Sequence, residues 1–138
     1  MAFQFSDAAR NASLDAIETA IGVSPTLEIR TGAPPANCAA ADTGTVLVTM
    51  ALPADWMAAA SGGAKALLGT WQDASADATG TAGYFRIKQG ATTHWQGTVS
   101  QNAANGGTGD MQLAQATAGI VAGQQVTVST MSLTAGGA

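Results

Sequence analysis

Apolar residues first recur at a helical spacing near the start of the chain. Leu14, Ile17 and Ile21 fall at positions i, i+3 and i+7, which place them on one face of a helix. Ser6 can cap the first turn, and Gly22 is suited to end the last one. The pattern therefore predicts a helix from about Ser6 to Ile21.

Charged and aromatic side chains flank this apolar stripe. Arg10 and Glu18 are charged residues of this segment that are set away from the stripe. Phe3 and Phe5 come just before the helix, where apolar residues often fix its entrance against the core. Both side chains are also candidates for contact with a partner.

Beyond the helix the period of the pattern changes from about four residues to two, which is typical of strands. Seven segments alternate or are continuously apolar, and turn residues separate them: 26–31, 43–52, 65–72, 81–89, 92–101, 110–113 and 125–133. The clearest hairpin joins 81–89 to 92–101 through Gly90 and Ala91. No second helix is long enough for a crossover between parallel strands.

These elements predict one fold class and one domain. We expect a mainly β protein, an antiparallel β-sandwich of jelly-roll-like form with one N-terminal α-helix, spanning residues 1–138 as a single domain. The helix would occupy about residues 6–21, and the strands would occupy about residues 26–133.

Charge is scarce along the whole chain, and this excludes several classes of protein. Only 10% of the 138 residues are charged, with 5 basic and 9 acidic side chains and a net charge of −4. Nucleic-acid binding requires clustered Lys and Arg, so we expect no direct nucleic-acid partner. No apolar run is long enough to span a membrane, and the first ten residues do not resemble a signal peptide.

Candidate catalytic and metal-binding residues are also few. His94 is the sole histidine and lies within a predicted strand, where a packing role is more common than catalysis. Cys38 has no second cysteine to pair with, so a small buried side chain is its default role. Asp73 and Asp77 share a polar turn that could hold calcium, although a solvated turn is the simpler interpretation. We therefore expect no enzyme activity, no cofactor and no resident metal.

The low charge has a positive interpretation. Mixed surface charge keeps free proteins apart, whereas a surface rich in small uncharged residues suits a chain covered by neighbours. Trp56, Trp71 and Trp95 are isolated in the sequence and suit either a core or an interface. Trp71, Trp95 and Tyr84 could instead present stacking faces for a sugar, as in an adhesin module.

The order of several ordinary segments is distinctive. These segments are Arg10-Asn11-Ala12, Leu14–Glu18, Ile21-Gly22, Leu27–Pro34, Thr43–Leu47, Leu52–Trp56, Gly80–Ile87 and Gln96-Gly97. In this order the chain resembles small virion structural proteins of tailed bacteriophages and prophages of Gram-negative bacteria. The resemblance covers most of the chain and carries no catalytic residues. It implies a component of the virion, assembled in the host cytoplasm.

Together, the resemblance and the composition favour a capsid decoration or cement protein. Such a protein would bind the major capsid protein or other virion proteins on the outer shell, as a symmetric homo-oligomer. The expected contact residues are Phe3, Phe5, Trp56 and Met57, together with exposed sheet edges. A tail, neck or fibre-associated module is the first alternative, and a carbohydrate-binding adhesin module is the second.

Overall fold

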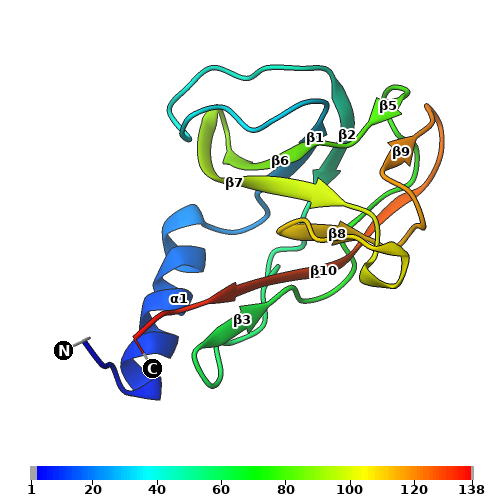
Figure 1. Cartoon of the computed structure of the whole chain (residues 1–138). Helices are drawn as coiled ribbons and strands as arrows, with labels where there is room; N and C mark the ends of the chain where they lie inside the picture. Colours follow the sequence, from blue (N-terminus) through cyan, green and yellow to red (C-terminus); the bar gives the residue numbers. More distant parts are fainter. Residues whose placement is uncertain (1–2, 138) are drawn as a thin grey trace.

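The structure is a computed structural model that describes residues 3–137. It is mainly β, with one curled mixed sheet and one α-helix at its end (Figure 1). The elements are α1 (Asp7–Ile21), β1 (Thr26–Arg30), β2 (Val46–Ala51), β3 (Ala64–Ala66), β4 (Gln72–Asp73), β5 (Gly80–Thr81), β6 (Tyr84–Gln89), β7 (Thr92–Ser100), the 3-10 helix η1 (Ala103–Asn105), β8 (Met111–Leu113), β9 (Gly119–Ile120) and β10 (Val126–Thr134).

The main sheet has the strand order β2-β1-β6-β7-β8-β10-β3, and β4 also pairs with β10. Strands β5 and β9 form a separate two-stranded sheet. The described pairings are antiparallel except that of β7 with β8, which is parallel. The prediction of a β-rich chain with one N-terminal helix is confirmed, but its purely antiparallel pairing is wrong. A single long loop through η1 carries the chain from β7 back to β8 in the same direction.

Helix α1 begins and ends where its capping residues predict. The Ser6 hydroxyl accepts a hydrogen bond from the Ala9 amide at 3.2 Å. Gly22 ends the helix with φ +94°, and its amide donates to the Glu18 carbonyl. The β6–β7 hairpin is also confirmed, with Gly90 at φ +60° in the two-residue turn.

The core lies inside the curl of the sheet and is organised around tryptophan. The ring centroids of Trp56 and Trp71 are 5.8 Å apart, and those of Trp56 and Trp95 are 6.5 Å apart. The Trp71 indole donates to the Trp56 carbonyl at 3.0 Å, and the Trp56 indole donates to the Gly22 carbonyl at 3.0 Å. The second bond ties the end of α1 to the core.

The placement of Trp56 corrects one prediction. The sequence favours Trp56 and Met57 as partner contacts, yet their exposed fractions are 0% and 1%. The segment after Pro53 runs alongside the end of β3, where Met57 forms a bridge with Leu67. This segment closes the curled sheet, and its two largest side chains pack in the core.

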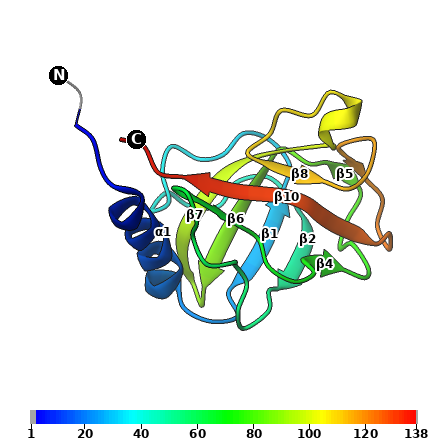
Figure 2. The same ribbon diagram turned by 90° about the horizontal axis from the view of Figure 1, so that it is seen from below.

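Both ends of the described chain lie beside α1, at one end of the molecule (Figure 2). The Phe5 amide donates to the Gly137 carbonyl, so the segment before α1 lies next to the segment after β10. The opposite end of the molecule carries β5, β9 and the start of β10 (Figure 1). The two ends therefore present different surfaces.

Candidate assembly surface

Every lysine and arginine of the chain is paired with a carboxylate inside the protein. The ion pairs are Arg10–Asp7, Arg30–Glu28, Arg30–Asp42, Lys65–Asp15, Lys65–Glu18, Arg86–Asp42, Lys88–Glu28 and Lys88–Asp42. The carboxylates outside these pairs are Asp55, Asp73, Asp77 and Asp110. The side chains that carry charge without an ion-pair partner are therefore all acidic.

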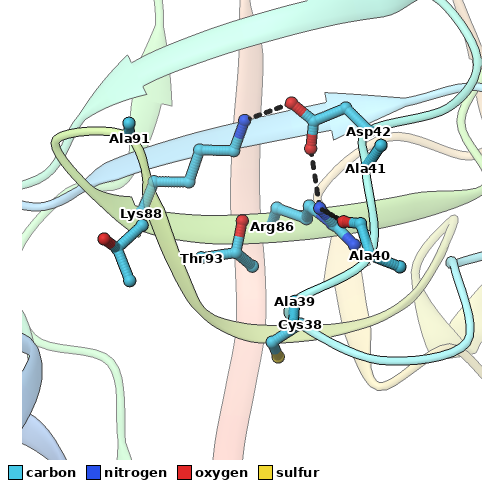
Figure 3. Close-up of a pocket in the computed structure, with 10 residues that line it drawn as sticks. Cys38, Ala39, Ala40, Ala41, Asp42, Arg86, Lys88, Ala91 and Thr93 are labelled. Carbon is cyan, nitrogen blue, oxygen red and sulfur yellow. Dashed lines mark hydrogen bonds and ion pairs between the residues drawn. The ribbon is translucent and has the colours of Figure 1, made fainter.

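One group of ion pairs surrounds Asp42 and a depression of about 520 Å³ (Figure 3). Asp42 accepts from Lys88 at 2.6 Å and from Arg86 at 2.8 Å. The hydrogen bond from Lys88, with help from Arg86 and Arg30, lowers the pKa of Asp42 against the opposing effect of burial. Cys38 lies half-buried on the rim of this depression.

The contacts of Arg86 indicate that this side chain stabilises the fold rather than binding a ligand in the depression. The side chain is 2% exposed, and its guanidinium donates to both Gln96 and Asp42. The remaining donors bind the carbonyls of Ala40 and Asn37. All five guanidinium hydrogens are thus used within the protein, which leaves none to bind a ligand. Arg86 holds the long loop between β1 and β2 against β6.

Three of the four unpaired carboxylates, those of Asp73, Asp77 and Asp110, bind residues at open edges of the sheet. On edge strand β2, the Thr49 amide donates to Asp73 at 3.3 Å and its hydroxyl donates to Asp77 at 2.8 Å. On β7, just beyond its pairing with β8, the Thr98 amide donates to Asp110 at 2.9 Å. A charged group bound to an edge amide blocks the addition of another strand. At these two places the edge amides are already bound within the chain, and the contact of the sheet edges with a partner stays a prediction.

The same bonds account for the polar turn that contains Asp73 and Asp77. Asp73 also accepts from the Ser75 amide, so both of its oxygens are engaged with the chain. Within residues 3–137, no group of three or more His, Cys, Asp or Glu side chains is arranged to hold a metal ion. The interpretation as a hydrogen-bonded turn, rather than a calcium site, fits these contacts.

The hydrogen bonds between Thr98 on β7 and Asp110, which we call the β7 cap, give a first prediction. Replacing Thr98 with Asp removes the hydroxyl that exchanges hydrogen bonds with Asp110 and places a second carboxylate beside it. We expect Thr98→Asp to lower the free energy of unfolding by about 1–2 kcal/mol, although Thr98 is exposed. Urea denaturation measures the loss. Thr130→Asp, at an exposed position on β10, is the control. Equal losses in the two variants would show that the cap contributes nothing.

The largest exposed apolar side chains near α1 form a different kind of surface. Phe3 is 87% exposed, Phe5 58% and Ile17 40%. Beside them lies a groove of about 430 Å³, which we call the α1 groove. It is lined by Phe5, Ala9, Arg10, Ser13, Leu14, Ile17, Leu133, Thr134, Ala135 and Gly136. Apolar surface of this kind is a common mark of a contact with another molecule.

Helix α1 packs on the protein through the buried side chains of Leu14 and Ile21 and through an ion-paired cluster beside them. Lys65, which is 2% exposed, donates to Asp15 at 2.6 Å and lies 2.7 Å from Glu18. Burial of Lys65 lowers its pKa, but the hydrogen bonds to Asp15 and Glu18 outweigh this effect and raise it. The hydrogen bond from Lys65 lowers the pKa of Asp15. With its acids turned inward, α1 leaves Ile17 outside.

Two expectations about α1 are therefore wrong. Ile17 lies on the surface rather than in the core, whereas Glu18 pairs with Lys65. Phe3 and Phe5 do not pack the helix entrance into the core, since both are exposed. Sequence periodicity missed this arrangement because the partner of the two acids, Lys65, lies about fifty residues further along.

The other predicted candidates are placed as follows. Trp71 and Tyr84 are buried, with exposed fractions of 1% and 0%, so neither presents a stacking face. His94 is exposed on β7, and Cys38 is half-buried. The structure thus places Phe5 in the lining of the α1 groove and leaves Phe3 exposed, and it places Trp56 and Met57 in the core instead.

Comparison with known proteins gives no relative to reason from: no family model, no curated protein and no solved structure matches the chain. Within residues 3–137 there is also no helix with the length and apolar character needed to cross a membrane.

Proposed function

We propose that this chain is a structural protein of a bacteriophage virion, and specifically a capsid decoration or cement protein. The observation that carries the proposal is an exposed apolar surface, the α1 groove with Phe3 and Phe5, on a chain whose cations are all neutralised internally. Such a surface gains stability when neighbours cover it. The distinctive segment order of the sequence supports the choice of a virion.

The proposed mechanism is mechanical. Each copy binds the major capsid protein or other virion proteins and links neighbouring subunits of the shell, as part of a symmetric homo-oligomer. High local concentration on the particle lets contacts that are weak individually act together. The chain has no catalytic role in this proposal. We also propose that the curled sheet belongs to the jelly-roll-like class of β-sandwich.

A tail, neck or fibre-associated module would use the same surface. Copy number separates it from the cement role, because a cement protein coats the shell in hundreds of copies and a tail component does not. No observation favours the adhesin alternative, since Trp71 and Tyr84 are buried.

The test is reconstitution on particles that lack this protein. We expect the purified chain to bind expanded shells and to raise the temperature at which they open. The double variant Phe3→Ser/Phe5→Ser should bind at least about tenfold more weakly, since two exposed aromatic anchors are lost. Val121→Ser removes another exposed apolar side chain, 60% exposed and remote from α1, and should bind normally. Absence of binding by the unaltered chain would reject the cement role.

A further inference from the structure

We infer that the α1 groove of one copy receives the segment Phe3–Phe5 of a second copy, and that the exchange is reciprocal. The inference rests on the proposed function, because it identifies one of the contacts that an assembled subunit would make. It names a second copy of this chain as the occupant, rather than a shell protein.

The chemistry of the α1 groove defines its occupant. Leu133 pairs with Lys65 across β10 and β3, so both side chains lie on the face that α1 covers. Leu133, Leu14, Ile17 and the same copy's Phe5, which forms part of the rim, make the groove apolar. Its one charged lining residue, Arg10, already bonds to Asp7 and to the Ala135 carbonyl. A charged occupant would therefore find no partner for its charge, and an uncharged apolar segment is required.

The backbone beside the groove can accept a strand. In β10, Leu133 lies opposite Lys65, and the amide of Ala135 bonds to the Gly63 carbonyl, so these two residues face β3. Ser132 and Thr134 point to the other side, where the described pairing with β8 stops at Met131. Both residues are exposed. Unlike β2 and β7, this edge has no aspartate bound to its amides among the described hydrogen bonds. Thr134 also lines the groove, so the open edge borders it.

The segment before α1 has the chemistry that the groove requires. Phe3, Gln4 and Phe5 carry no charge and alternate apolar with polar, as a strand with one buried face does. Both phenyl groups are exposed, and the segment runs outward from the body (Figure 2). It is fixed at the same end as the groove by the bond from Phe5 to Gly137.

The Phe3–Phe5 segment and the α1 groove lie at the same end of the molecule, which favours a two-fold arrangement of two copies. In a two-fold dimer, each subunit donates and accepts with the same surface, so one contact is automatically made twice. Asp73, at the end of β4, and Asp77, in the turn that follows, are bound to Thr49 of β2 and are absent from the groove lining, so they do not oppose this arrangement. An exchange this short buries less than a standard interface of about 1,600 Å². We therefore expect weak association in dilute solution and full occupancy only at high concentration.

Disulfide trapping between two differently labelled chains tests the inference directly. One chain carries Gln4→Cys and the other Ser13→Cys, a mild change on the exposed rim of the groove, and both carry Cys38→Ala. The matched control replaces Ser13→Cys with Ser129→Cys, at an exposed serine on β10 outside the groove lining. Thermal unfolding first establishes that each variant is folded. Mass spectrometry then counts mixed dimers after mild oxidation at high protein concentration.

We expect at least about fivefold more mixed dimer for the Gln4–Ser13 pair than for the Gln4–Ser129 pair, because proximity raises the effective thiol concentration. Adding Phe3→Ser/Phe5→Ser to the Gln4→Cys chain should remove the excess. Equal yields for the two pairs would overturn the inference, as would an excess that survives without the phenyl groups. Shell binding is scored separately: trapped dimers without shell binding would reject the cement role alone, and shell binding with equal yields would reject the exchange alone.

Discussion

Replacing Arg86 with Met should destabilise the protein more than any other single substitution proposed for it. The side chain is 2% exposed, and its five donors serve Asp42, Gln96 and two loop carbonyls. Met fills a similar volume but donates nothing, so these acceptors lose their partner in a partly buried place. We expect a loss of about 3–5 kcal/mol in the free energy of unfolding, measured by urea denaturation.

A matched control separates the role of Arg86 from the charge balance around Asp42. Lys88→Met removes a cation from the same carboxylate, but Lys88 is more exposed and bonds no loop carbonyl in the described structure. It should cost about 1 kcal/mol. Arg86→Met should also speed hydrogen exchange in the loop between β1 and β2, whereas Lys88→Met should not. If the two variants lose equal stability, Arg86 does not hold that loop.

Local signals explain which elements the sequence alone could predict. The cap at Ser6 and the glycine at position 22 define α1 within its own length, and Gly90 defines the β6–β7 hairpin within a two-residue turn. These features depend on neighbouring residues only. Phe3 and Phe5 are exposed, as contact residues must be, and their role as contact residues stays a prediction.

Contacts between distant segments explain what the sequence alone could not predict. The parallel pairing of β7 with β8 depends on how the loop through η1 returns to the sheet. The burial of Trp56 depends on Trp71 and on the Gly22 carbonyl. One wall of the α1 groove comes from Leu133, near the C-terminal end of the chain. The sequence of α1 alone therefore could not predict the groove.

The same long-range contact decides what the protein exposes. With Glu18 and Asp15 turned toward Lys65, the few charges of the chain stabilise its interior, and the helix presents Ile17 outward. A chain with more charge could solvate that face. The packing that pairs these acids with Lys65 thus also leaves apolar surface beside α1, and the proposed assembly role depends on it.

The second large effect is expected for Lys65→Met, which tests that arrangement. The variant removes the cation between Asp15 and Glu18 and leaves the Ala58 carbonyl without its donor. At neutral pH we expect a loss of about 3 kcal/mol, at the low end for a buried pair because Asp15 is half-exposed. Equilibrium unfolding in urea between pH 7 and pH 4 measures it.

The pH dependence should differ in sign between the two proteins. In the unaltered protein the pKa of Asp15 is lowered by Lys65, so its contribution is present above the unfolded pKa near 4 and is lost as pH falls below it. In Lys65→Met the carboxylates of Asp15 and Glu18, which both bind Lys65 in the unaltered protein, repel each other with no cation between them. The variant should therefore gain stability as pH falls from 7 toward 4 and this repulsion is relieved, while the unaltered protein gains none from Asp15.

A double-mutant cycle with Glu18→Gln makes the reversal visible at one pH. On the unaltered chain Glu18→Gln removes a partner of Lys65 and of the Met57 amide, so it should destabilise. On the Lys65→Met chain the same change removes one of two repelling carboxylates, so it should stabilise. Opposite signs require that Lys65 and Glu18 act on each other directly. If Glu18→Gln destabilises both chains equally, α1 is held by its apolar contacts at Leu14 and Ile21, and the outward position of Ile17 has another cause.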